Sequence, residues 1–524
     1  MDFIYKKSGG IFNMHSYWTK QPVEAIKYFM SKYSSEGDVV LDPFSGTGMT
    51  GVAAKELGRN VILNDISPIS IHISKGYCED LDMESRQTEL DSFLKKIDTK
   101  LSKLYSTDCS KCHNTAPILF SIVGEVWQSK DGKSTENRGQ MMLDEKGTES
   151  FNKDFIFKEF TLIKVCYKCD CSSTKLYKEP DETDISRWKT NDFKKYFYPK
   201  NSFFGQEPKR NYKRDIKEVW QLYSARNITA LSIVFEEIGK VENGGLRNVL
   251  SFAFTSILFN SSLMSRYRSY ENTSIKMGTF YVPPLIKDTN VLKNFETKLS
   301  LILKNKDAQF ATTSKASISY LMENADDLKS IKSNSIDYIY TDPPYSDVIN
   351  YAELNIVYES WLDEQTNVSN EMIVSKFYHK DIDYYANRLE KALKEAYRVL
   401  KPGAHMTLVF HHPNIEHWAS IQDAVINSGF SPIKSGKPIR LISNSKTSSQ
   451  HKTGKKSQCF LVFNFKKTNT PLNISLKNLT ESDYIKSLKR SYQKASEKGY
   501  KSESDQFDYM INDFLFKYKL KNIT

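Results

Sequence analysis

The chain has 524 residues, of which 39 % are hydrophobic and 26 % charged, and its formal net charge is +11. This length exceeds one ordinary core, so we expect two or three domains, and the composition is typical of a soluble globular protein. We find no run of about 18 apolar residues and no signal-peptide pattern at the N-terminus. We therefore expect a cytoplasmic protein whose seven cysteines are thiols or metal ligands rather than disulfides. The excess of positive charge favours a polyanionic partner.

The first segment with a chemical signature runs from Val39 to Gly48. Its apolar start ends at Asp42, which predicts a short buried parallel strand. Gly46 and Gly48 follow, and glycines at this point allow a tight strand-to-helix turn and a close approach of the backbone to a ligand. We therefore expect a loop that cradles a nucleoside cofactor at the end of this strand.

A second predicted strand, at 61–63, ends in Asn64 and Asp65. An acid at that edge of a sheet can accept hydrogen bonds from two ribose hydroxyls. The same spacing satisfies the dinucleotide fingerprint of dehydrogenases, so spacing alone leaves NAD and S-adenosylmethionine open. Asp42, which can meet a cationic amino group, and Phe44, which follows a proline in a rigid loop, favour S-adenosylmethionine.

Far downstream, the alternating segment 335–340 predicts another strand, which leads into Thr341-Asp342-Pro343-Pro344-Tyr345. The exocyclic amine of adenine or cytosine is a poor nucleophile because its lone pair is delocalised into the ring. Acceptors on both of its N–H groups stabilise the positive charge that develops during methyl transfer, and we expect the Asp342 carboxylate and the Pro343 carbonyl to supply them. The two prolines fix this loop. Tyr345 is predicted to stack on a base that has been flipped out of the duplex.

Together, the glycine loop and the Asp-Pro-Pro-Tyr run resemble the signature pair of the nucleic-acid amino-methyltransferases, which methylate adenine N6 or cytosine N4. The resemblance implies a class I Rossmann-like methyltransferase that binds S-adenosylmethionine. It also implies cofactor contacts from a segment upstream of the first strand, with Thr19 and Gln21 as candidates, while an ordinary helix N-cap at Thr19 is the alternative. By the same resemblance, Asn324 or Asp326 contacts the cofactor's adenine, because Asn324 stands where the family usually has an acid.

The order of the two signatures, with a long insertion between them, matches a permuted order known for DNA amino-methyltransferases. The predicted fold class is α/β, a class I Rossmann-like methyltransferase sheet with a large inserted zinc-knuckle and helical domain. We expect four regions: the first half of the methyltransferase domain at 1–80, an insertion with the target-recognition region at 81–310, the second half at 311–466 and a helical basic extension at 467–524. Within the second half, we expect a helix at about 384–400 and strands at 404–411, 432–441 and 458–465.

The insertion contains two Cys-x-x-Cys pairs, Cys109/Cys112 and Cys166/Cys169, and a spare Cys171. Two such pairs present four thiolates, which is the ligand set of a tetrahedral structural zinc site. Because the pairs lie far apart in the sequence, reduced and unliganded thiols are the alternative. The combination resembles bacterial adenine-specific DNA methylases that contain a zinc ribbon.

Further along, the insertion becomes basic and aromatic. Cations for phosphates interleaved with rings for bases favour contact with DNA, and the alternative is a loop whose rings are buried. The candidate segments are Lys194–Lys200, Lys209–Arg214 and Ser265–Tyr270. Two adjacent histidines, His411 and His412, end a predicted strand, and we expect them to be polar surface rather than catalytic.

The function we expect is methylation of the exocyclic amine of a flipped base in double-stranded DNA by S-adenosylmethionine. Adenine N6 is favoured, because N4-cytosine relatives often carry Ser in place of the Asp. Resemblance alone implies a bacterial restriction–modification or phage-defence setting, with a cognate restriction endonuclease or defence-system subunits as candidate partners and no membrane partner. An N4-cytosine enzyme, an RNA amino-methyltransferase and a catalytically decayed DNA-binding module are the alternatives.

Overall fold

The computed structural model describes most of the chain up to residue 412 and shorter segments beyond it. The described residues are 2–5, 10–80, 86–144, 154–268, 275–276, 278–310, 316–412, 417, 421, 423–425, 427–433, 439–443, 460–468 and 497. The helical extension predicted at 467–524 therefore lies almost entirely outside the described residues. Among the helices that are described, none is both long and apolar enough to cross a membrane.

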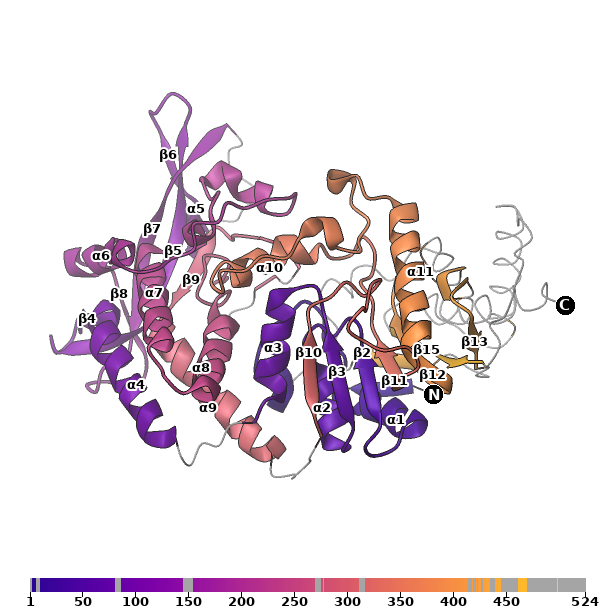
Figure 1. Cartoon of the computed structure of the whole chain (residues 1–524). Coiled ribbons are helices and arrows are strands. Elements are labelled where there is room, and N and C mark those ends of the chain that lie inside the picture. The colour runs from indigo at the N-terminus through magenta and orange to yellow at the C-terminus, as the bar shows by residue number, and fades with distance from the viewer. Residues whose placement is uncertain are drawn as a thin grey trace.

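Segments from both ends of the described chain form one nine-stranded sheet (Figure 1). Its strands are β1 (Asp2–Tyr5), β2 (Val39–Asp42), β3 (Asn60–Asn64), β10 (Ile318–Leu321), β11 (Ile336–Thr341), β12 (Leu400–Phe410), β13 (Phe430–Pro432), β14 (Ile439–Ser443) and β15 (Phe460–Lys467). The order in space is β1-β14-β15-β12-β11-β2-β3-β10, and β13 also pairs with β15. From β12 to β10 all neighbours are parallel, whereas β15 runs antiparallel to β12.

Helices cover both faces of this sheet. They are α1 (Val23–Tyr33), α2 (Met49–Glu56), α3 (Pro68–Cys78) and α11 (Ile382–Val399), and a further helix, α10 (Tyr351–Glu359), packs on α3. Successive residues of a strand point to opposite faces. Accordingly, Val40 of β2 packs into the core on the side of α1, α2 and α3, and Leu41 packs into the core under α11. The parallel strands, the crossover helices and the strand order confirm the predicted α/β class I Rossmann-like sheet.

The elements predicted around the two signatures are present at nearly the predicted positions. The strands expected at 39–41, 61–63, 335–340, 404–411 and 458–465 correspond to β2, β3, β11, β12 and β15, and the helix expected at 384–400 corresponds to α11. The strand expected at 432–441 corresponds to two strands, β13 and β14, which both pair antiparallel with β15. Residues 434–438, between those two strands, lie outside the described residues.

The middle of the chain forms a second, antiparallel sheet that the sequence did not predict. Its strands are β4 (Ser106–Asp108), β5 (Thr115–Ser129), β6 (Thr135–Asn137), β7 (Phe155–Tyr167), β8 (Leu176–Lys178) and β9 (Leu285–Thr289). Strand β5 is the centre of this sheet, because β4, β6, β7 and β9 all pair with it. Strand β8 pairs with β7.

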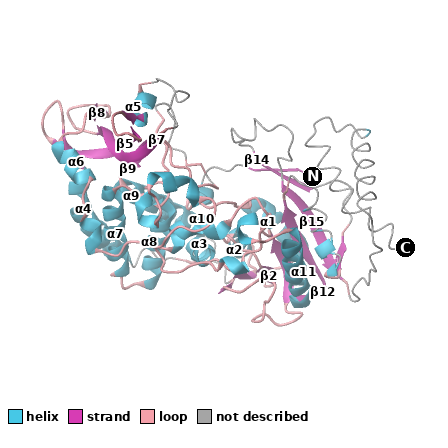
Figure 2. Ribbon diagram, turned by 90° about the horizontal axis from the view of Figure 1, so that it is seen from above, coloured by secondary structure: helices cyan, strands magenta, loops and turns pink. Residues whose placement is uncertain are grey.

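A layer of helices lies between the two sheets (Figure 2). The α-helices of the middle region are α4 (Gln87–Leu101), α5 (Arg138–Leu143), α6 (Glu182–Trp188), α7 (Ala225–Gly239), α8 (Gly244–Ile257) and α9 (Val291–Phe310). Short 3-10 segments connect the elements: η1 (Gly10–Asn13), η3 (Ser102–Tyr105), η4 (Asp192–Lys195), η5 (Pro208–Arg214), η6 (Val219–Leu222), η7 (Val368–Asn370) and η8 (Lys376–Tyr378). Helix α8 packs directly on α3, because a Cβ at Gly76 would lie only 2.1 Å from the Phe252 ring.

Candidate functional site

A cleft lies at the carboxyl ends of the parallel strands β2, β3 and β11. Its non-atom space, open solvent included, is about 960 Å³. The predicted residues that line it are Thr19, Gln21, Asp42, Phe44, Gly46, Asp65, Asn324, Asp342 and Pro344. Gly48, Asp326, Pro343 and Tyr345 are adjacent in sequence to lining residues but do not line the cleft themselves. The fold thus brings the glycine loop and the Asp-Pro-Pro-Tyr loop to one site.

Two glycines shape the loop after β2 for different reasons. Gly46 has φ of +50° and Gly48 has φ of +74°, which are left-handed conformations that residues with a Cβ rarely adopt. A Cβ at Gly48 would also lie 2.7–2.8 Å from Ser74 of α3, whereas the nearest atom to a Cβ at Gly46 is 3.9 Å away on Tyr17. Gly48 therefore allows the loop to pack on α3, and Gly46 leaves room in the cleft.

The two acids at the strand ends organise this loop. Asp42 accepts hydrogen bonds from the Phe44 N–H at 3.2 Å and the Thr50 hydroxyl at 2.5 Å. Asp65 accepts them from the Gly46 N–H and the Ser67 N–H, both at 2.9 Å. Burial raises the pKa of Asp42 to about 7 and that of Asp65 to about 6. Two carboxylates that are costly to ionise would be stabilised by a cationic ligand in the cleft.

Asp342 is the centre of the second loop. Its carboxylate accepts a hydrogen bond from the Gln21 amide at 2.6 Å and another from the Tyr345 hydroxyl. The same Gln21 amide lies 3.2 Å from the Tyr345 hydroxyl, so the three side chains form one network. Burial raises the pKa of Asp342 to about 7. The N-terminal segment thereby reaches the Asp-Pro-Pro-Tyr loop directly.

Tyr345 has a different setting from the one its predicted stacking role requires. It is 5 % exposed, and its ring packs edge-on against Phe410 and close to Phe460. The Tyr345 hydroxyl donates a hydrogen bond to Asp342, and the Tyr345 ring does not line the cleft. Pro343, the predicted source of a second acceptor, does not line the cleft, whereas Pro344 does. The Pro344 carbonyl accepts a hydrogen bond from Tyr385 of α11 at 2.8 Å.

The structure distinguishes the two candidates for the adenine contact. Asn324 lines the cleft, and its Oδ1 atom is buried without a hydrogen-bond partner in the described part of the chain. Asp326 instead forms an ion pair with Arg388 of α11, at 2.6 Å between Oδ2 and Nε. Asn324 is therefore the residue available to a ligand.

Thr19 and Gln21 both reach the cleft from the segment before α1. The N-cap residue of α1 is Pro22, and no side chain caps this helix, so Thr19 is not the N-cap. The Thr19 hydroxyl lies 3.4 Å from the Tyr351 hydroxyl across the cleft. This contact joins the N-terminal segment to the start of α10.

Several cleft residues were not predicted. Among them are Tyr17, Tyr351, Thr366, Glu371 and Arg388. Tyr351 is the first residue of α10, and no local pattern marks the segment that contains Glu371. Burial raises the pKa of Glu371 to about 7. Its Oε1 atom accepts a hydrogen bond from the Ala352 N–H at 3.0 Å.

Several buried polar atoms on the cleft wall have no hydrogen-bond partner among the described residues. Among them are Gln21 Oε1, Ser45 Oγ, Asn324 Oδ1 and Glu371 Oε2. Buried polar atoms are nearly always paired, because an unpaired one loses its hydration without compensation. The cleft is therefore matched to a ligand that carries several hydrogen-bond donors.

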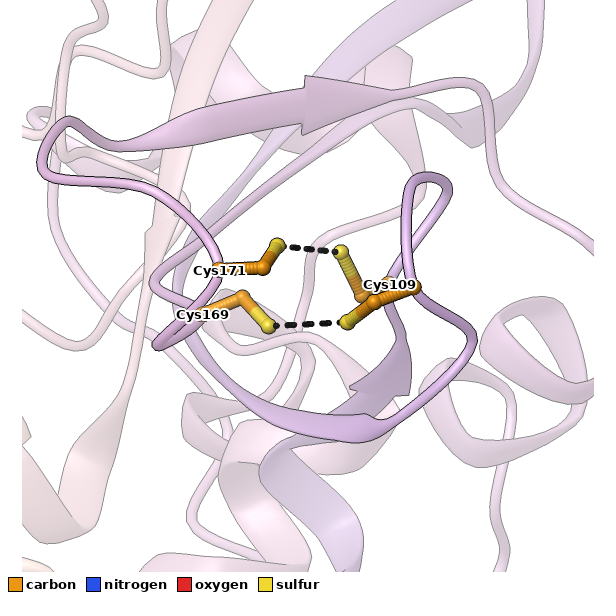
Figure 3. Close-up of side chains that lie close together, drawn as sticks. Cys109, Cys169 and Cys171 are labelled. Atoms are coloured by element: carbon orange, nitrogen blue, oxygen red, sulfur yellow. Dashed lines mark hydrogen bonds between the residues drawn. The ribbon is translucent and has the colours of Figure 1, made fainter.

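A cluster of four cysteines lies in the insertion, at the turns after β4 and β7 (Figure 3). Its members are Cys109, Cys112, Cys169 and Cys171, whose sulfur atoms all lie within 4.8 Å of one another. Two sulfur pairs, Cys109 with Cys171 and Cys112 with Cys169, are 3.5 Å apart. With Zn–S bonds of about 2.3 Å, sulfur atoms in a tetrahedral site are roughly 3.8 Å apart. The donor set and spacing fit zinc.

One predicted member of this set was wrong. Cys166 is not in the cluster, and Cys171 takes its place. Cys166 lies within β7, where it packs into a separate core with Phe120 and Ile163. Cys169 and Cys171 come after the strand has ended, so their side chains are free to turn toward Cys109 and Cys112.

A buried acid of α10 contacts the backbone of the insertion. Glu353 is fully buried, and its Oε2 atom accepts hydrogen bonds from the backbone N–H groups of Gln206 at 3.0 Å and Glu207 at 2.8 Å. Gly205 has φ of +86°, and a Cβ there would lie 2.1 Å from the Glu353 carboxyl carbon. We call this contact the Glu353 anchor.

The candidate DNA segments are partly exposed and partly built into the fold. The lysines of Lys194–Lys200 are exposed, and Phe197 is 43 % exposed, whereas Phe193 in the same loop is buried. In Lys209–Arg214, the side chains of Lys209, Arg210, Tyr212 and Lys213 are exposed. Tyr267 of the third segment packs near Phe120, and residues 269–270 lie outside the described residues.

The two histidines at the end of β12 differ. His411 is half-buried and lies edge-on to Phe460. The prediction of a surface position was wrong for His412, which is fully buried and lies 2.8 Å from Asp347.

Comparison with known proteins links the two halves of the sheet to a family. The model of the N6/N4 methyltransferase family, described as DNA methylase, matches residues 5–81 and 336–521, just over half of the chain. The type II methyltransferase M.MjaII of Methanocaldococcus jannaschii is 31 % identical over 86 residues. Those residues are 16 % of this chain and 16 % of that protein, so the chain spans about a sixth of that relative's length.

Solved structures give further, weaker matches. A Thermus thermophilus protein described as a candidate DNA modification methylase is 18 % identical, with 32 % of this chain and 58 % of that chain covered and a TM-score of 0.16. An S-adenosylmethionine-dependent methyltransferase of Mesorhizobium loti is 13 % identical, with 31 % and 76 % covered and a TM-score of 0.16.

Proposed function

Because this chain belongs to the DNA methylase family of N6/N4 methyltransferases, we propose that it transfers a methyl group from S-adenosylmethionine to the exocyclic amine of a flipped base in duplex DNA, most favourably adenine N6. The observation that carries the proposal is the Gln21–Asp342 hydrogen bond of 2.6 Å. It joins the N-terminal segment and the Asp-Pro-Pro-Tyr loop in the cleft that the glycine loop also lines.

The residues present fit S-adenosylmethionine. This cofactor carries an ammonium group, a sulfonium group and an adenine amine, which match a cleft with buried unpartnered acceptors such as Asn324 Oδ1 and Ser45 Oγ. Asp42 and Asp65 supply negative charge beside the glycine loop. Thr19, Gln21, Phe44 and Gly46 complete the residues that we propose to hold the cofactor. When bound, S-adenosylmethionine supplies the electrophilic methyl group.

Asp342 is the group that we propose to activate the target amine. An ionised carboxylate accepts about four hydrogen bonds, and Gln21 and Tyr345 occupy only part of that capacity. The remaining lone pairs can accept the amine N–H and stabilise the positive charge that develops on nitrogen. Because Gln21 and Tyr345 hold the carboxylate in place, this acceptor is preorganised.

Double-stranded DNA is the proposed substrate. The net charge of +11 and the exposed lysines and arginine of 194–200 and 209–214 suit phosphate contacts. The Glu353 anchor holds residues 206–207, which directly precede the second of these segments, against α10, and α10 begins six residues after Tyr345. The insertion is therefore our candidate for target recognition. The setting we propose is bacterial restriction–modification or phage defence in the cytoplasm, alongside a cognate endonuclease or defence subunit.

We also propose that Cys109, Cys112, Cys169 and Cys171 hold a structural zinc ion. The Lys111 N–H and the Tyr167 hydroxyl donate hydrogen bonds to Cys109 Sγ, which is the kind of outer contact that stabilises thiolate ligands. The ion would join the turn after β4 to the turn after β7.

Methyl transfer in vitro tests the proposed reaction. The full chain is incubated with S-adenosylmethionine that carries a labelled methyl group, together with unmethylated duplex DNA or with RNA of the same sequence. Label in the DNA supports the proposal, whereas label in RNA alone supports an RNA amino-methyltransferase. Calorimetry without DNA separates a decayed enzyme, which binds no cofactor, from an active one that lacks its recognition sequence.

A further inference from the structure

A second group of metal-ligating side chains lies outside both the cleft and the cysteine cluster. Asp347, His412 and His417 each offer one ligand atom, and these atoms lie within 4.8 Å of one another. His412 Nε2 is 2.8 Å from Asp347 Oδ1, and the two imidazole centroids are 3.7 Å apart. None of the three residues lines the cleft.

The burial of the two imidazoles points to a ligand. His412 is fully buried and His417 is 6 % exposed, so both rings have lost most of their contact with water. His417 Nδ1 has no hydrogen-bond partner among the described residues. Buried polar atoms are nearly always paired, and a cation is a partner that two adjacent imidazoles can share.

The third side chain comes from the Asp-Pro-Pro-Tyr loop itself. Ser346 lies between Tyr345 and Asp347, is fully buried and has φ of +58°. A residue other than glycine keeps this conformation only where its surroundings fix it. The backbone at Ser346 therefore sets the position of Asp347, whose side chain is 52 % exposed.

We propose that Asp347, His412 and His417 bind one divalent transition-metal ion, with zinc as the first candidate. Two imidazoles and a carboxylate suit Zn²⁺ and its close neighbours in the first transition row. Three protein ligands leave a fourth position for water or an anionic oxygen such as a phosphate. The ion would brace the loop that carries Asp342 and Tyr345 against the end of β12.

Cobalt substitution of the full-length protein tests this site separately from the cysteine cluster. Thiolate ligands give Co²⁺ an intense charge-transfer band in the near ultraviolet, whereas imidazole and carboxylate ligands do not. After metal removal and titration with Co²⁺, we expect two equivalents to bind, only one of which gives the thiolate band. A single equivalent that gives the thiolate band would overturn the proposal.

Variants assign the second equivalent to its ligands. Asp347→Ala removes a half-exposed side chain and His417→Ala removes a buried one, so the first variant remains informative if the second fails to fold. Both should bind one equivalent of Co²⁺ with the thiolate band intact. His379→Asn is the matched control, because His379 is exposed and Asn tolerates its φ of +53°, and it should bind two equivalents. Two equivalents in Asp347→Ala would contradict the assignment.

Discussion

The proposed chemistry of the cleft depends on the two carboxylate oxygens of Asp342. One of its carboxylate oxygens is held by Gln21 and the other by Tyr345. Burial raises its pKa to about 7. The negative charge that makes Asp342 a good acceptor therefore depends on pH. Replacing this side chain and titrating it therefore test the same role in two ways.

Removal of the carboxylate should abolish activation of the amine. Loss of one preorganised hydrogen-bonding group at a developing charge costs about 10²–10³ in kcat, and we expect at least this loss for Asp342→Ala in labelled methyl transfer. The affinity for S-adenosylmethionine, measured by calorimetry, should change only a few-fold. Asp327→Ala is the control, because Asp327 is an exposed acid outside the cleft. Wild-type kcat in Asp342→Ala would refute the role of this residue.

The pH dependence of the reaction should report the same group. The ionised form of Asp342 is the acceptor, so kcat/KM for DNA at saturating cofactor should rise with pH and level off above the pKa. Because a cationic cofactor favours the ionised form, the midpoint should lie at or below about 7. Asp342→Asn has no ionisable group at this position, so its residual kcat/KM should not show this rise with pH. If the same rise with pH persists in Asp342→Asn, the pH dependence comes from another group.

At the scale of elements, local patterns were predictable and long-range pairings were not. Apolar runs and glycine spacing are local, so β2, β3, β11 and the glycine loop were found from the sequence. Cys166 and Cys169 have the same spacing as Cys109 and Cys112, but spacing does not reveal that Cys166 is still inside β7. The pairing of β5 with β7 and the cleft positions of Tyr351 and Glu371 depend on tertiary packing, which leaves no periodic signal.

Among the contacts between secondary-structure elements, we expect the Glu353 anchor to have the largest effect on DNA binding. Gly205→Ala places a Cβ against the Glu353 carboxyl, and overpacking of this kind costs about 1–3 kcal/mol. We expect a higher KM for DNA, with the affinity for S-adenosylmethionine unchanged. Gly239→Ala is the control, because no atom lies within 4 Å of a Cβ at that position. If Gly205→Ala is destabilised but its KM for DNA is unchanged, the anchor has only a structural role.

In the molecule as a whole, the cleft and the cysteine cluster belong to different sheets. Figure 1 shows helices between these two sheets. The cleft is built at the edge of the parallel sheet, and the cluster joins two turns of the antiparallel sheet. Loss of the proposed zinc ion from the cluster should therefore destabilise the insertion without removing any group from the cleft.

Cysteine variants test this separation. Cys109→Ser with Cys112→Ser should release zinc, measured by elemental analysis, and should lower Tm by at least about 5 °C. Cys166→Ser is the matched control, because Cys166 lies outside the cluster, and it should retain the metal. Native protein that is purified with zinc in the medium and contains none would contradict the zinc proposal.

Single-molecule sequencing of DNA from cells that express this chain tests the central claim most directly, because it identifies the base and its position together. The wild-type chain should produce N6-methyladenine at one recurrent sequence, and the Asp342→Ala chain should produce none. N4-methylcytosine at a recurrent sequence would show that the target is the N4 amine of cytosine instead. Unmodified DNA from cells in which the wild-type chain is folded and binds S-adenosylmethionine would contradict the claim that the cleft methylates DNA.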